Sequence, residues 1–498
     1  MTAAPHWTAH LPAGASAADV DLGAGGTLPR RWVAHWRADP GRAVLRDWSG
    51  RWWSGGELDA RTATVAGRFA AAGLVPGDRV LVSAASTVDL VVAHVACLRA
   101  GLTVIPANTA YGADELAHLV VDGAPRMAVV DDAERASWVR AAGPGVRVVG
   151  TDVDLPDGPI PELDAAAPDA PALIGYTSGT TGRPKGAVLT HANLTSSVEA
   201  LRLAWRWTPE DRLVLALPLF HMHGLGVGLH GTLAAGASAV LLERFDVDAV
   251  LDAAATERAS LFFGVPTMYH RLASSPRAAE LAALRLCVSG SAPLPADLWR
   301  GMATVSGQRV LERYGMTETV MLVSNPYDGE RRPGTVGIAL PGVDVRLAEG
   351  TGEVLVRGPN VFAGYLNRPE VTADSFDAEG FFRTGDVGRL DDAGYLELVA
   401  RLKELVISGG FNVYPREVED VLREHPGVVD AAVTGTPDPE WGEVVTAWCE
   451  TDGSVSAAEL TAFTAERLAN YKRPRIVHLV DALPRNALGK VTKGALRA

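Results

Sequence analysis

The sequence contains few cysteines, and the three that it has lie far apart. Cys97, Cys287 and Cys449 form no CxxC pair in a chain of 498 residues. Neither a disulfide framework nor a zinc motif is therefore predicted. A reduced, cytoplasmic environment fits this usage. A chain of this length can bury a large core without such cross-links.

Long apolar runs and a leader-like N-terminus are also missing. No stretch of 18 apolar residues occurs, and the apolar segment 89–107 is interrupted by His94 and Arg99. The N-terminus lacks a basic region followed by an apolar one. We therefore expect neither a membrane span nor a signal peptide.

Positive charge is in the minority. The chain has 46 Lys and Arg against 59 Asp and Glu, a net charge of −13. This balance argues against a general nucleic-acid binder, because neutralising phosphates requires clustered basic residues. It is compatible with one anionic ligand in a local basic pocket. The hydrophobic fraction of 47% is typical of a soluble globular protein.

Short apolar strands alternate with amphipathic helices through the first 340 residues. A helix is expected at 88–98, ended by Gly101. Strands are expected at 80–83, 103–106, 127–130, 212–216, 237–242 and 284–289. This alternation predicts an α/β fold with largely parallel sheets. The Ala/Gly/Pro-rich residues 1–30 are expected to form a loose arm.

The pattern changes after about residue 340. Strands expected at 343–347, 352–357 and 395–399, joined by Gly/Asp turns, predict a small β-rich subdomain. Beyond residue 401 an α+β pattern follows. The predicted organisation is thus a large N-terminal domain, 1–400, of mixed or parallel sheets flanked by helices, and a C-terminal α+β domain, 401–498.

One segment, 176–186, is rich in glycine and hydroxyl groups. It follows the apolar run 172–174 and ends in Pro184-Lys185-Gly186. Glycines allow backbone N–H groups to turn toward an anion, and Lys185 adds a positive charge suited to phosphate. Because Pro184 precedes the lysine, this is not the Walker pattern. A flexible linker is disfavoured, since linkers rarely abut a strand.

The string Thr-Ser-Gly-Thr-Thr-Gly-x-Pro-Lys-Gly at 177–186 resembles the phosphate loop of the adenylate-forming enzymes, which include acyl-CoA and aryl-CoA ligases, peptide-synthetase adenylation domains and luciferases. Further motifs of this family span about 176–490. The resemblance implies ATP, Mg²⁺ and coenzyme A as cofactors and a mobile C-terminal domain. It assigns to ATP binding Thr177, Ser178, Gly179, Thr180, Thr181, Gly182 and Lys185.

Two further motifs match the family, and the first follows an expected strand, where open α/β sheets bind ligands. The resemblance makes the turn of Gly290, Ser291, Ala292 and Pro293 one wall of the adenine site. It assigns to ATP or AMP binding Glu312, Arg313, Tyr314, Gly315, Met316 and Thr317. Glu318 offers Mg²⁺ a carboxylate. Asp386 and Arg401 become ribose ligands, although Asp386 alone would be a turn aspartate and Ala400 replaces the family's usual glycine.

The segment 218–224 resembles the part of the chain that lines the family's acyl pocket. Its His221 and His223 have no nearby Cys or carboxylate, so a core or pocket histidine is favoured over a metal ligand. The resemblance places His221 near the reacting carboxylate. The glycines that follow, at 224, 226, 228 and 231, have a spacing typical of helix packing.

Four motifs of the C-terminal part complete the resemblance. It implies a hinge at Lys403 and a pantetheine-guiding loop at Gly409 and Gly410. Lys472 and Arg473 are either contacts for the phosphates of coenzyme A or a solvated basic face. Lys490, in the segment 484–490, matches the catalytic lysine. With it, Lys185, His221, Thr317 and Glu318 form the predicted catalytic set.

The acid substrate is predicted from segments near the acyl pocket. Segments 221–225, 321–326 and 332–337 resemble malonyl-CoA and methylmalonyl-CoA synthetases. Arg271 enters a helix that should border the pocket, where it would pair with a second carboxylate; the alternative is that it extends to solvent. His221, Ser291 and Met316 complete the predicted acid site.

The predicted activity is an AMP-forming acid:CoA ligase acting on malonate or methylmalonate. Two alternatives remain: a ligase for medium-chain, long-chain or aryl acids, and an adenylating enzyme that passes its acyl group to a carrier protein or another nucleophile. The expected partners are small molecules, with no nucleic acid, and the chain is expected to be a monomer or a homodimer.

Overall fold

The computed structural model describes residues 6–177, 183–408, 411–439, 441–485 and 490–496. The chain divides into two compact units. The first contains residues 1–344 and 356–382, and the second contains residues 345–355 and 383–498. The predicted domain boundary near residue 400 stays a prediction. Among the described residues, no helix combines the length and apolar character that crossing a membrane requires.

A seven-stranded sheet forms one half of the first unit. Its order is β18 (Gly364–Tyr365), β8 (Lys185–Thr190), β7 (Pro171–Thr177), β4 (Thr103–Pro106), β3 (Arg79–Ser83), β5 (Met127–Val130) and β6 (Arg147–Val149). The strands from β7 to β6 run parallel, whereas β8 is antiparallel to both β7 and β18. The central strands are buried on both faces, which explains their continuous apolar runs.

A nine-stranded sheet forms the other half. Its order is β15 (Ile338–Ala339), β14 (Val323–Ser324), β13 (Leu311–Tyr314), β12 (Leu286–Ser289), β11 (Leu261–Gly264), β9 (Arg212–Leu215), β10 (Ser238–Leu241), β1 (Ala43–Arg46) and β2 (Trp52–Ser54). From β13 to β1 neighbouring strands are parallel, and β2, β14 and β15 add antiparallel edges.

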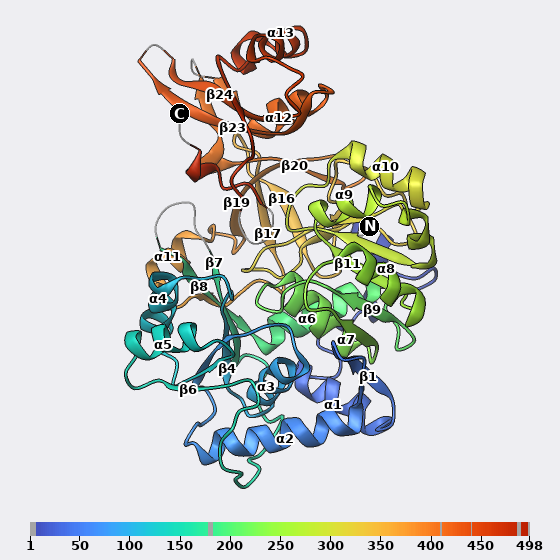
Figure 1. The fold of residues 1–498 in the computed structure, drawn as a ribbon, viewed down its shortest axis with the longest axis vertical. Coiled ribbons are helices and arrows are strands. Elements are labelled where there is room, and N and C mark those ends of the chain that lie inside the picture. Colours follow the sequence, from blue (N-terminus) through green and yellow to red (C-terminus); the bar gives the residue numbers. More distant parts are fainter. Residues whose placement is uncertain (1–5, 178–182, 409–410, 440, 486–489, 497–498) are drawn as a thin grey trace. The chain divides into compact units, whose positions relative to one another are not determined.

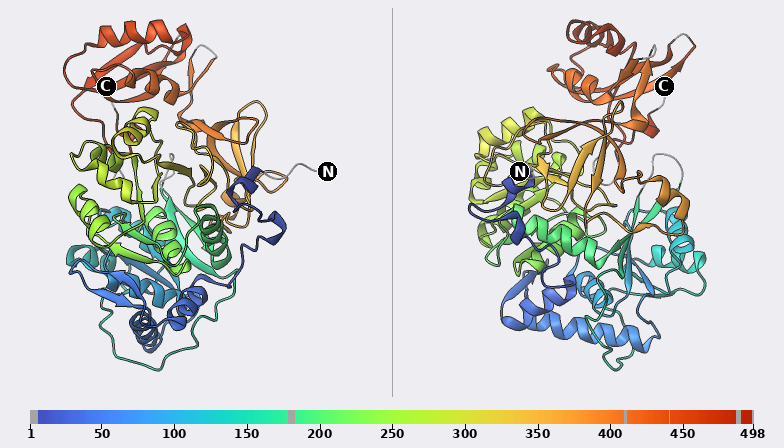
Figure 2. Two further views of the ribbon diagram at one scale, coloured as in Figure 1. Left: turned by 90° about the vertical axis from the view of Figure 1, so that its right-hand side faces the viewer. Right: turned by 180° about the vertical axis from the view of Figure 1, so that it is seen from behind.

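Helices cover both sheets (Figures 1 and 2). In the first unit they are α1 (Leu28–Ala38), α2 (Gly55–Ala71), α3 (Val88–Arg99), α4 (Ala113–Gly123), α5 (Ala133–Ala142), α6 (His191–Ala204), α7 (His230–Ala234), α8 (Val247–Thr256), α9 (Pro266–Ala273), α10 (Ala296–Ser306) and α11 (Pro369–Asp374). The first unit also contains the 3₁₀ helices η1 (His6–His10), η2 (Ala17–Asp19) and η4 (Ala278–Ala283) and the π-helix η3 (His223–Leu229). The second unit contains the 3₁₀ helix η5 (Leu402–Glu404).

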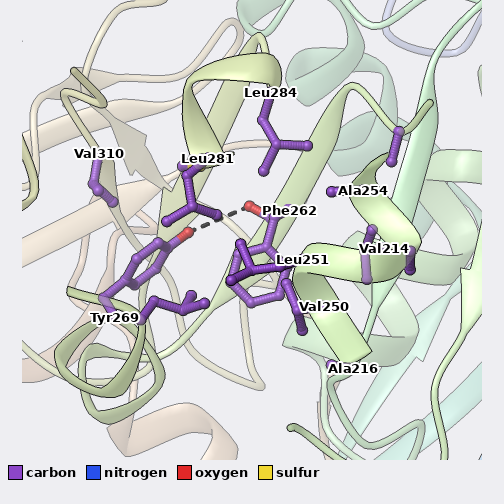
Figure 3. Close-up of a cluster of buried hydrophobic side chains, with 14 of the residues drawn as sticks. Val214, Ala216, Val250, Leu251, Ala254, Phe262, Tyr269, Leu281, Leu284 and Val310 are labelled. Carbon is purple, nitrogen blue, oxygen red and sulfur yellow. Dashed lines mark hydrogen bonds between the residues drawn. The ribbon is translucent and has the colours of Figure 1, made fainter. Parts of the chain in front are cut away.

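The cores lie between the sheets and these helices. Side chains from α4 and α5 pack on β3 and β5 in one cluster. In another, Phe262 of β11 packs against Tyr269 of α9, whose hydroxyl donates to the Phe262 carbonyl at 3.3 Å (Figure 3). The same hydroxyl lies 2.9 Å from the Val288 carbonyl of β12. A buried phenol thus finds acceptors and ties α9 to two strands.

The second unit contains two smaller sheets. The four-stranded sheet has the order β16 (Asp344–Leu347), β17 (Glu353–Arg357), β19 (Phe382–Leu390) and β20 (Leu396–Arg401). The other has the order β22 (Phe411–Val413), β21 (Val406–Ser408), β24 (Gly442–Thr451) and β23 (Val428–Asp438), with β25 (Ile476–Val480) parallel to β24. Helices α12 (Pro415–Arg423) and α13 (Ala457–Arg467) pack on it, with η6 (Asn470–Lys472) and η7 (Lys493–Ala495).

The predicted α/β architecture is confirmed, and the N-terminal expectation is wrong. Residues 1–30 are not a loose arm over their described part. His10 is buried and its Nε2 lies 3.3 Å from the Ile338 carbonyl, while its own carbonyl accepts from Arg206. Leu28 is fully buried at the start of α1. Long-range packing of a few apolar side chains outweighed a composition that favours turns.

Candidate active site

Three predicted motifs follow parallel strands of the nine-stranded sheet. Strands β12 and β13 are parallel neighbours, so the turn at 290–293 and the segment 315–318 begin at the same edge. The π-helix η3 follows β9 in the same sheet. The carboxyl edge of parallel strands is where open α/β sheets bind ligands. The structure therefore places all three segments at the carboxyl edge of this sheet, whereas sequence reasoning expected a strand-end position only for the turn at 290–293.

The glycine-rich segment lies in a hairpin between β7 and β8. Thr177 and Lys185 are paired residues of these antiparallel strands. Residues 178–182, which include the predicted ligands Ser178 to Gly182, lie outside the described residues. Within β7, a Cβ at Gly175 would overlap the Thr317 methyl group. Thr317 thus packs directly on the strand that leads into the predicted phosphate loop.

Lys185 and Glu318 approach the same tyrosine. The Tyr365 hydroxyl donates to Glu318 Oε1 at 2.9 Å, and Lys185 Nζ lies 5.2 Å from the centre of the Tyr365 ring. Burial, together with the Glu318 charge, raises the pKa of Tyr365. Sequence reasoning missed Tyr365, because nothing in its local pattern distinguishes it from a core aromatic residue such as Phe362, on which it packs.

Glu318 fits the predicted magnesium role in kind. It is a buried carboxylate, and Mg²⁺ usually takes one or two carboxylates beside substrate phosphates. Among the described residues no cluster of three or more His, Cys, Asp or Glu is arranged to hold a metal.

The turn after β12 lies against Arg313. A Cβ at Gly290 would overlap the Arg313 guanidinium group, so only glycine leaves room for it. Ser291 adopts a left-handed backbone conformation with φ of +69°, and Leu294 N donates to Glu312 Oε1 at 2.8 Å. Ala292 and Pro293 remain partly exposed. Side chains of β13 thus shape the predicted adenine wall.

Arg313 is the most unusual side chain at this edge. The residue is 4% exposed, and neither Nε nor Nη2 has a hydrogen-bond partner among the described residues. Burial lowers the pKa of Arg313 to about 9, although Glu312 opposes this shift. Buried polar groups are normally paired, so unpaired guanidinium N–H groups indicate a place for an anion.

Two histidines lie beside Arg313. His223 Nδ1 is 3.3 Å from Ser291 Oγ, and the backbone N–H of His223 donates to His221 Nδ1 at 3.2 Å. Burial, with a contribution from Arg313, lowers the pKa of His221 to about 4. Both imidazoles are therefore neutral near pH 7. Sequence reasoning favoured a core or pocket role for the pair but missed the contact of His223 with Ser291, because the two residues are far apart in the sequence.

The glycines after His223 serve packing, as their spacing indicated. Gly224 faces the Pro218 carbonyl, Gly228 faces Leu215, and Gly231 faces the Trp207 ring, each too closely for a Cβ. They let η3 and α7 approach their neighbours. π-Helical turns often occur at functional sites.

Arg271 does not join this group. It is exposed on α9, and its guanidinium lies 4.9 Å from the centre of the Phe245 ring. Met316 is half-buried, and its N–H donates to Thr319 Oγ1 at 3.3 Å. The acid-binding roles of these two residues stay predictions. Tyr314 is buried at the end of β13, one residue before Gly315.

In the second unit, the two predicted ribose ligands contact each other. Asp386 and Arg401 are paired across β19 and β20, and Arg401 Nε donates to Asp386 Oδ1 at 2.8 Å. The predicted hinge residue Lys403 follows in η5. Lys490 is exposed, yet partial desolvation, and then the charge of Arg401, lower its pKa.

The predicted contacts for coenzyme A are partly occupied within the unit. Lys472 Nζ pairs with Glu417 Oε1 at 2.6 Å, and Arg473 Nε donates to the Leu468 carbonyl at 2.9 Å. Gly409 and Gly410 lie outside the described residues. The role of these four residues in binding coenzyme A stays a prediction.

Comparison with known proteins decides the family. The AMP-binding enzyme model matches residues 32–366, and the model of the AMP-binding enzyme C-terminal domain matches residues 417–490. The chain belongs to the AMP-binding enzyme family. Within this family it is an AMP-forming acyl-CoA ligase, for which ATP and coenzyme A are the implied co-substrates.

Relatives of this AMP-binding enzyme differ in their acid. Feruloyl-CoA synthase of Amycolatopsis is 40% identical over 463 residues, covering 89% of this chain and 92% of its own length. Malonate–CoA ligase of Arabidopsis thaliana is 39% identical over 368 residues, covering 66% and 60%. The crystal structure of ATP-bound MatB from Rhodopseudomonas palustris matches with a TM-score of 0.89 at 41% identity, covering 95% and 98%.

Proposed function

We propose that this acyl-CoA ligase acts on a short dicarboxylic acid, with malonate or methylmalonate as substrate. The observation that carries the proposal is Arg313, a buried guanidinium with unpaired N–H groups beside Gly290 and near His221. A monocarboxylic acid would bring only the carboxylate that reacts. A dicarboxylic acid brings a second one, which can pair with Arg313.

The physical argument concerns the cost of burying Arg313 alone. A buried donor without a partner costs about 1–3 kcal/mol, and more when it is charged. A carboxylate restores the lost interactions through charge-assisted hydrogen bonds, which the planar guanidinium favours. A purely apolar acyl chain would leave the cost in place. The neutral His221 and His223 add no competing positive charge.

The named relatives are compatible with this substrate class. The plant relative is a malonate–CoA ligase, and a product complex of a malonyl-CoA ligase with methylmalonyl-CoA and AMP matches at 44% identity and a TM-score of 0.67. Feruloyl-CoA synthase, at 40% identity, supports an aryl acid as the second candidate. Ferulate carries no second carboxylate, so Arg313 is the residue that separates the two candidates.

In the proposed first half-reaction, a carboxylate oxygen of the acid attacks the α-phosphorus of ATP. A P–O bond to the β-phosphate breaks, pyrophosphate leaves, and an acyl-adenylate forms. Lys185 and Lys490 offset the negative charge that develops on the phosphates. Thr317 would donate its hydroxyl to phosphate, and Glu318 would hold Mg²⁺, which would supply positive charge beside the phosphates.

In the proposed second half-reaction, the thiol of coenzyme A attacks the acyl carbonyl and AMP leaves. Rotation of the C-terminal part about Lys403 would remove Lys490 and present the loop of Gly409 and Gly410 to the pantetheine arm. Such a motion lets one site serve two transition states. Asp386 and Arg401 would bind the ribose.

A pyrophosphate-release panel tests the proposal. Purified protein with ATP and Mg²⁺ is supplied with malonate, methylmalonate, butyrate or ferulate, with and without coenzyme A. We expect the highest kcat/KM with malonate or methylmalonate. Pyrophosphate should be released over repeated turnovers only when coenzyme A is present. A preference for ferulate would instead support the aryl-acid ligase. Turnover with a carrier protein but not with coenzyme A would support the adenylating enzyme that passes its acyl group to a carrier protein.

A further inference from the structure

The loop that carries Lys490 is closed at its base. Arg485 and Val491 form an antiparallel β-bridge, and Thr492 N donates to the Pro484 carbonyl at 2.7 Å. The chain therefore leaves and returns at one point of the second unit. Whatever fixes this base also fixes where the loop can carry Lys490.

Ion pairs hold the base on its incoming side. Arg485 Nη2 lies 2.5 Å from Asp430 Oδ2 of β23 and 3.9 Å from Glu450 Oε2 of β24. Glu450 Oε2 also accepts from Leu483 N at 3.1 Å. These contacts attach the incoming side of the loop to β23 and β24 of the five-stranded sheet.

One lysine holds the base on its outgoing side. Lys493 Nζ lies 2.8 Å from Glu419 Oε1 and 3.1 Å from Glu404 Oε2. Glu419 is a buried residue of α12, and the same oxygen accepts from Val433 N at 2.9 Å. Glu404 ends η5, directly after Lys403. Lys493 thus connects the Lys490 loop both to a fixed helix and to the predicted hinge.

Electrostatics favour the charged forms of Glu404 and Lys493. Burial alone would raise the pKa of Glu404, but Lys493 lowers it, with smaller effects from Lys490 and Arg401. Burial alone would lower the pKa of Lys493, but Glu419 and Glu404 raise it. The ammonium of Lys493 lies within ion-pair distance of both carboxyl groups.

We infer that Lys493 is a positioning residue for the adenylation half-reaction: it joins the base of the Lys490 loop to Glu404 beside the hinge, so that Lys490 and the hinge segment move as one piece. The inference rests on the proposed role of Lys490. Without Lys493, repulsion between Glu404 and Glu419 loosens the base, and Lys490 samples more positions. Misplacing a catalytic group by about 1 Å costs up to roughly 100-fold in rate.

The test separates the two half-reactions in the full chain. Lys493→Met, Lys493→Arg and Glu404→Gln are compared with the unaltered protein. Adenylation is followed by malonate-dependent ATP–pyrophosphate exchange, and thioester formation is followed from supplied malonyl-adenylate and coenzyme A. The matched control is Arg467→Met, which removes an exposed ion pair with Glu424 in the same unit. Thermal unfolding reports on folding of each variant.

For Lys493→Met we expect kcat for adenylation to fall about 10- to 100-fold, with KM for ATP changed less than about 3-fold, and thioester formation unchanged. Lys493→Arg should recover most of the adenylation rate, and Glu404→Gln should show a smaller loss of the same kind. Arg467→Met should change neither rate.

Three outcomes overturn the inference: no loss in Lys493→Met, an equal loss in both half-reactions, or no recovery in Lys493→Arg. If Lys493→Met fails to fold, Glu404→Gln decides by the same split. Lys490→Ala is measured beside them. If Lys490→Ala leaves adenylation intact, the proposed role of Lys490 fails. If it slows adenylation and Lys493→Met does not, only the positioning role fails.

Discussion

The guanidinium group of Arg313 lies beside Gly290 at the edge of the nine-stranded sheet, so close that a Cβ on residue 290 would overlap it. Gly290 belongs to the turn after β12, and Arg313 belongs to the neighbouring strand β13. The absence of one side chain therefore determines the position of another. The proposed acid site can therefore be tested by changing either Arg313 or Gly290.

Arg313→Met is expected to remove the preference for dicarboxylic acids. Methionine keeps much of the volume but cannot pair with a second carboxylate. The loss of hydrogen bonds to a charged group, about 1.5–3 kcal/mol, corresponds to roughly 10- to 150-fold in kcat/KM for malonate. The kcat/KM for butyrate should change little. Both values are measured by pyrophosphate release.

Arg271→Met serves as the comparison, because the sequence alone predicted Arg271 as the partner of the second carboxylate. The structure leaves it exposed over Phe245. We expect at most a 3-fold change for malonate, about the size of a lost exposed contact. A selective loss of malonate activity in Arg271→Met, but not in Arg313→Met, would restore the sequence prediction and refute the role of Arg313.

Gly290→Ala is expected to act through Arg313. The added methyl group displaces the guanidinium, so KM for malonate should rise about 10-fold while butyrate is less affected. The control is Gly301→Ala in α10, where a Cβ meets no atom within 4 Å. That exchange should stabilise the helix by about 0.5–1 kcal/mol and leave both acids unaffected. Equal KM shifts for both acids would contradict the mechanism.

Much of this fold could be predicted from local patterns. Helix 88–98 and the strands at 103–106 and 127–130 were expected within a residue of α3, β4 and β5, because buried parallel strands read as short apolar runs. The β7–β8 hairpin was not predicted, since the glycine-rich segment hides its second strand. The pairing of two strands across such a segment depends on tertiary structure, which the local sequence pattern does not show.

Candidate site residues could be named from the sequence where they belong to one local motif. Lys185, Thr317 and Glu318 were named from motifs. The structure brings Lys185 and Glu318 to Tyr365 and packs Thr317 against Gly175. Arg313 was assigned to the nucleotide and Arg271 to the acid, because sequence spacing does not say which arginine is buried. Burial of Arg313 depends on Gly290 in another turn, a long-range relationship that neither segment shows alone.

Lys490→Ala is expected to separate the two half-reactions. Its ammonium would offset charge on ATP phosphates only during adenylation, so malonate-dependent ATP–pyrophosphate exchange should fall by roughly 100- to 1,000-fold. Thioester formation from supplied malonyl-adenylate should stay within about 3-fold, because AMP leaves without that lysine. Stopped assays of each half-reaction provide the measurement. Equal losses in both would contradict the two-state scheme.

Acid destabilisation is expected from buried neutral histidines of the first unit. His94 Nε2 lies 2.8 Å from His230 Nε2, and burial lowers the pKa of His94 to about 3. Burial lowers the pKa of His191 to about 4, and it lowers the pKa of His230 well below its ordinary value. Because these folded-state pKa values lie below the ordinary value, their contribution to stability is fully present above about pH 6.5. It is lost as the pH falls toward 4.

His94→Gln tests this origin. Glutamine can still hydrogen-bond to His230 but does not titrate, so unfolding should take up about one proton fewer between pH 6.5 and 5. The free energy of unfolding of the variant should therefore fall less steeply with decreasing pH. The difference in slope should be up to about 1.4 kcal/mol per pH unit, measured by urea unfolding. His6→Gln, at an exposed position, is the control and should keep the original slope. Identical slopes for His94→Gln and the unaltered protein would show that the acid sensitivity arises elsewhere.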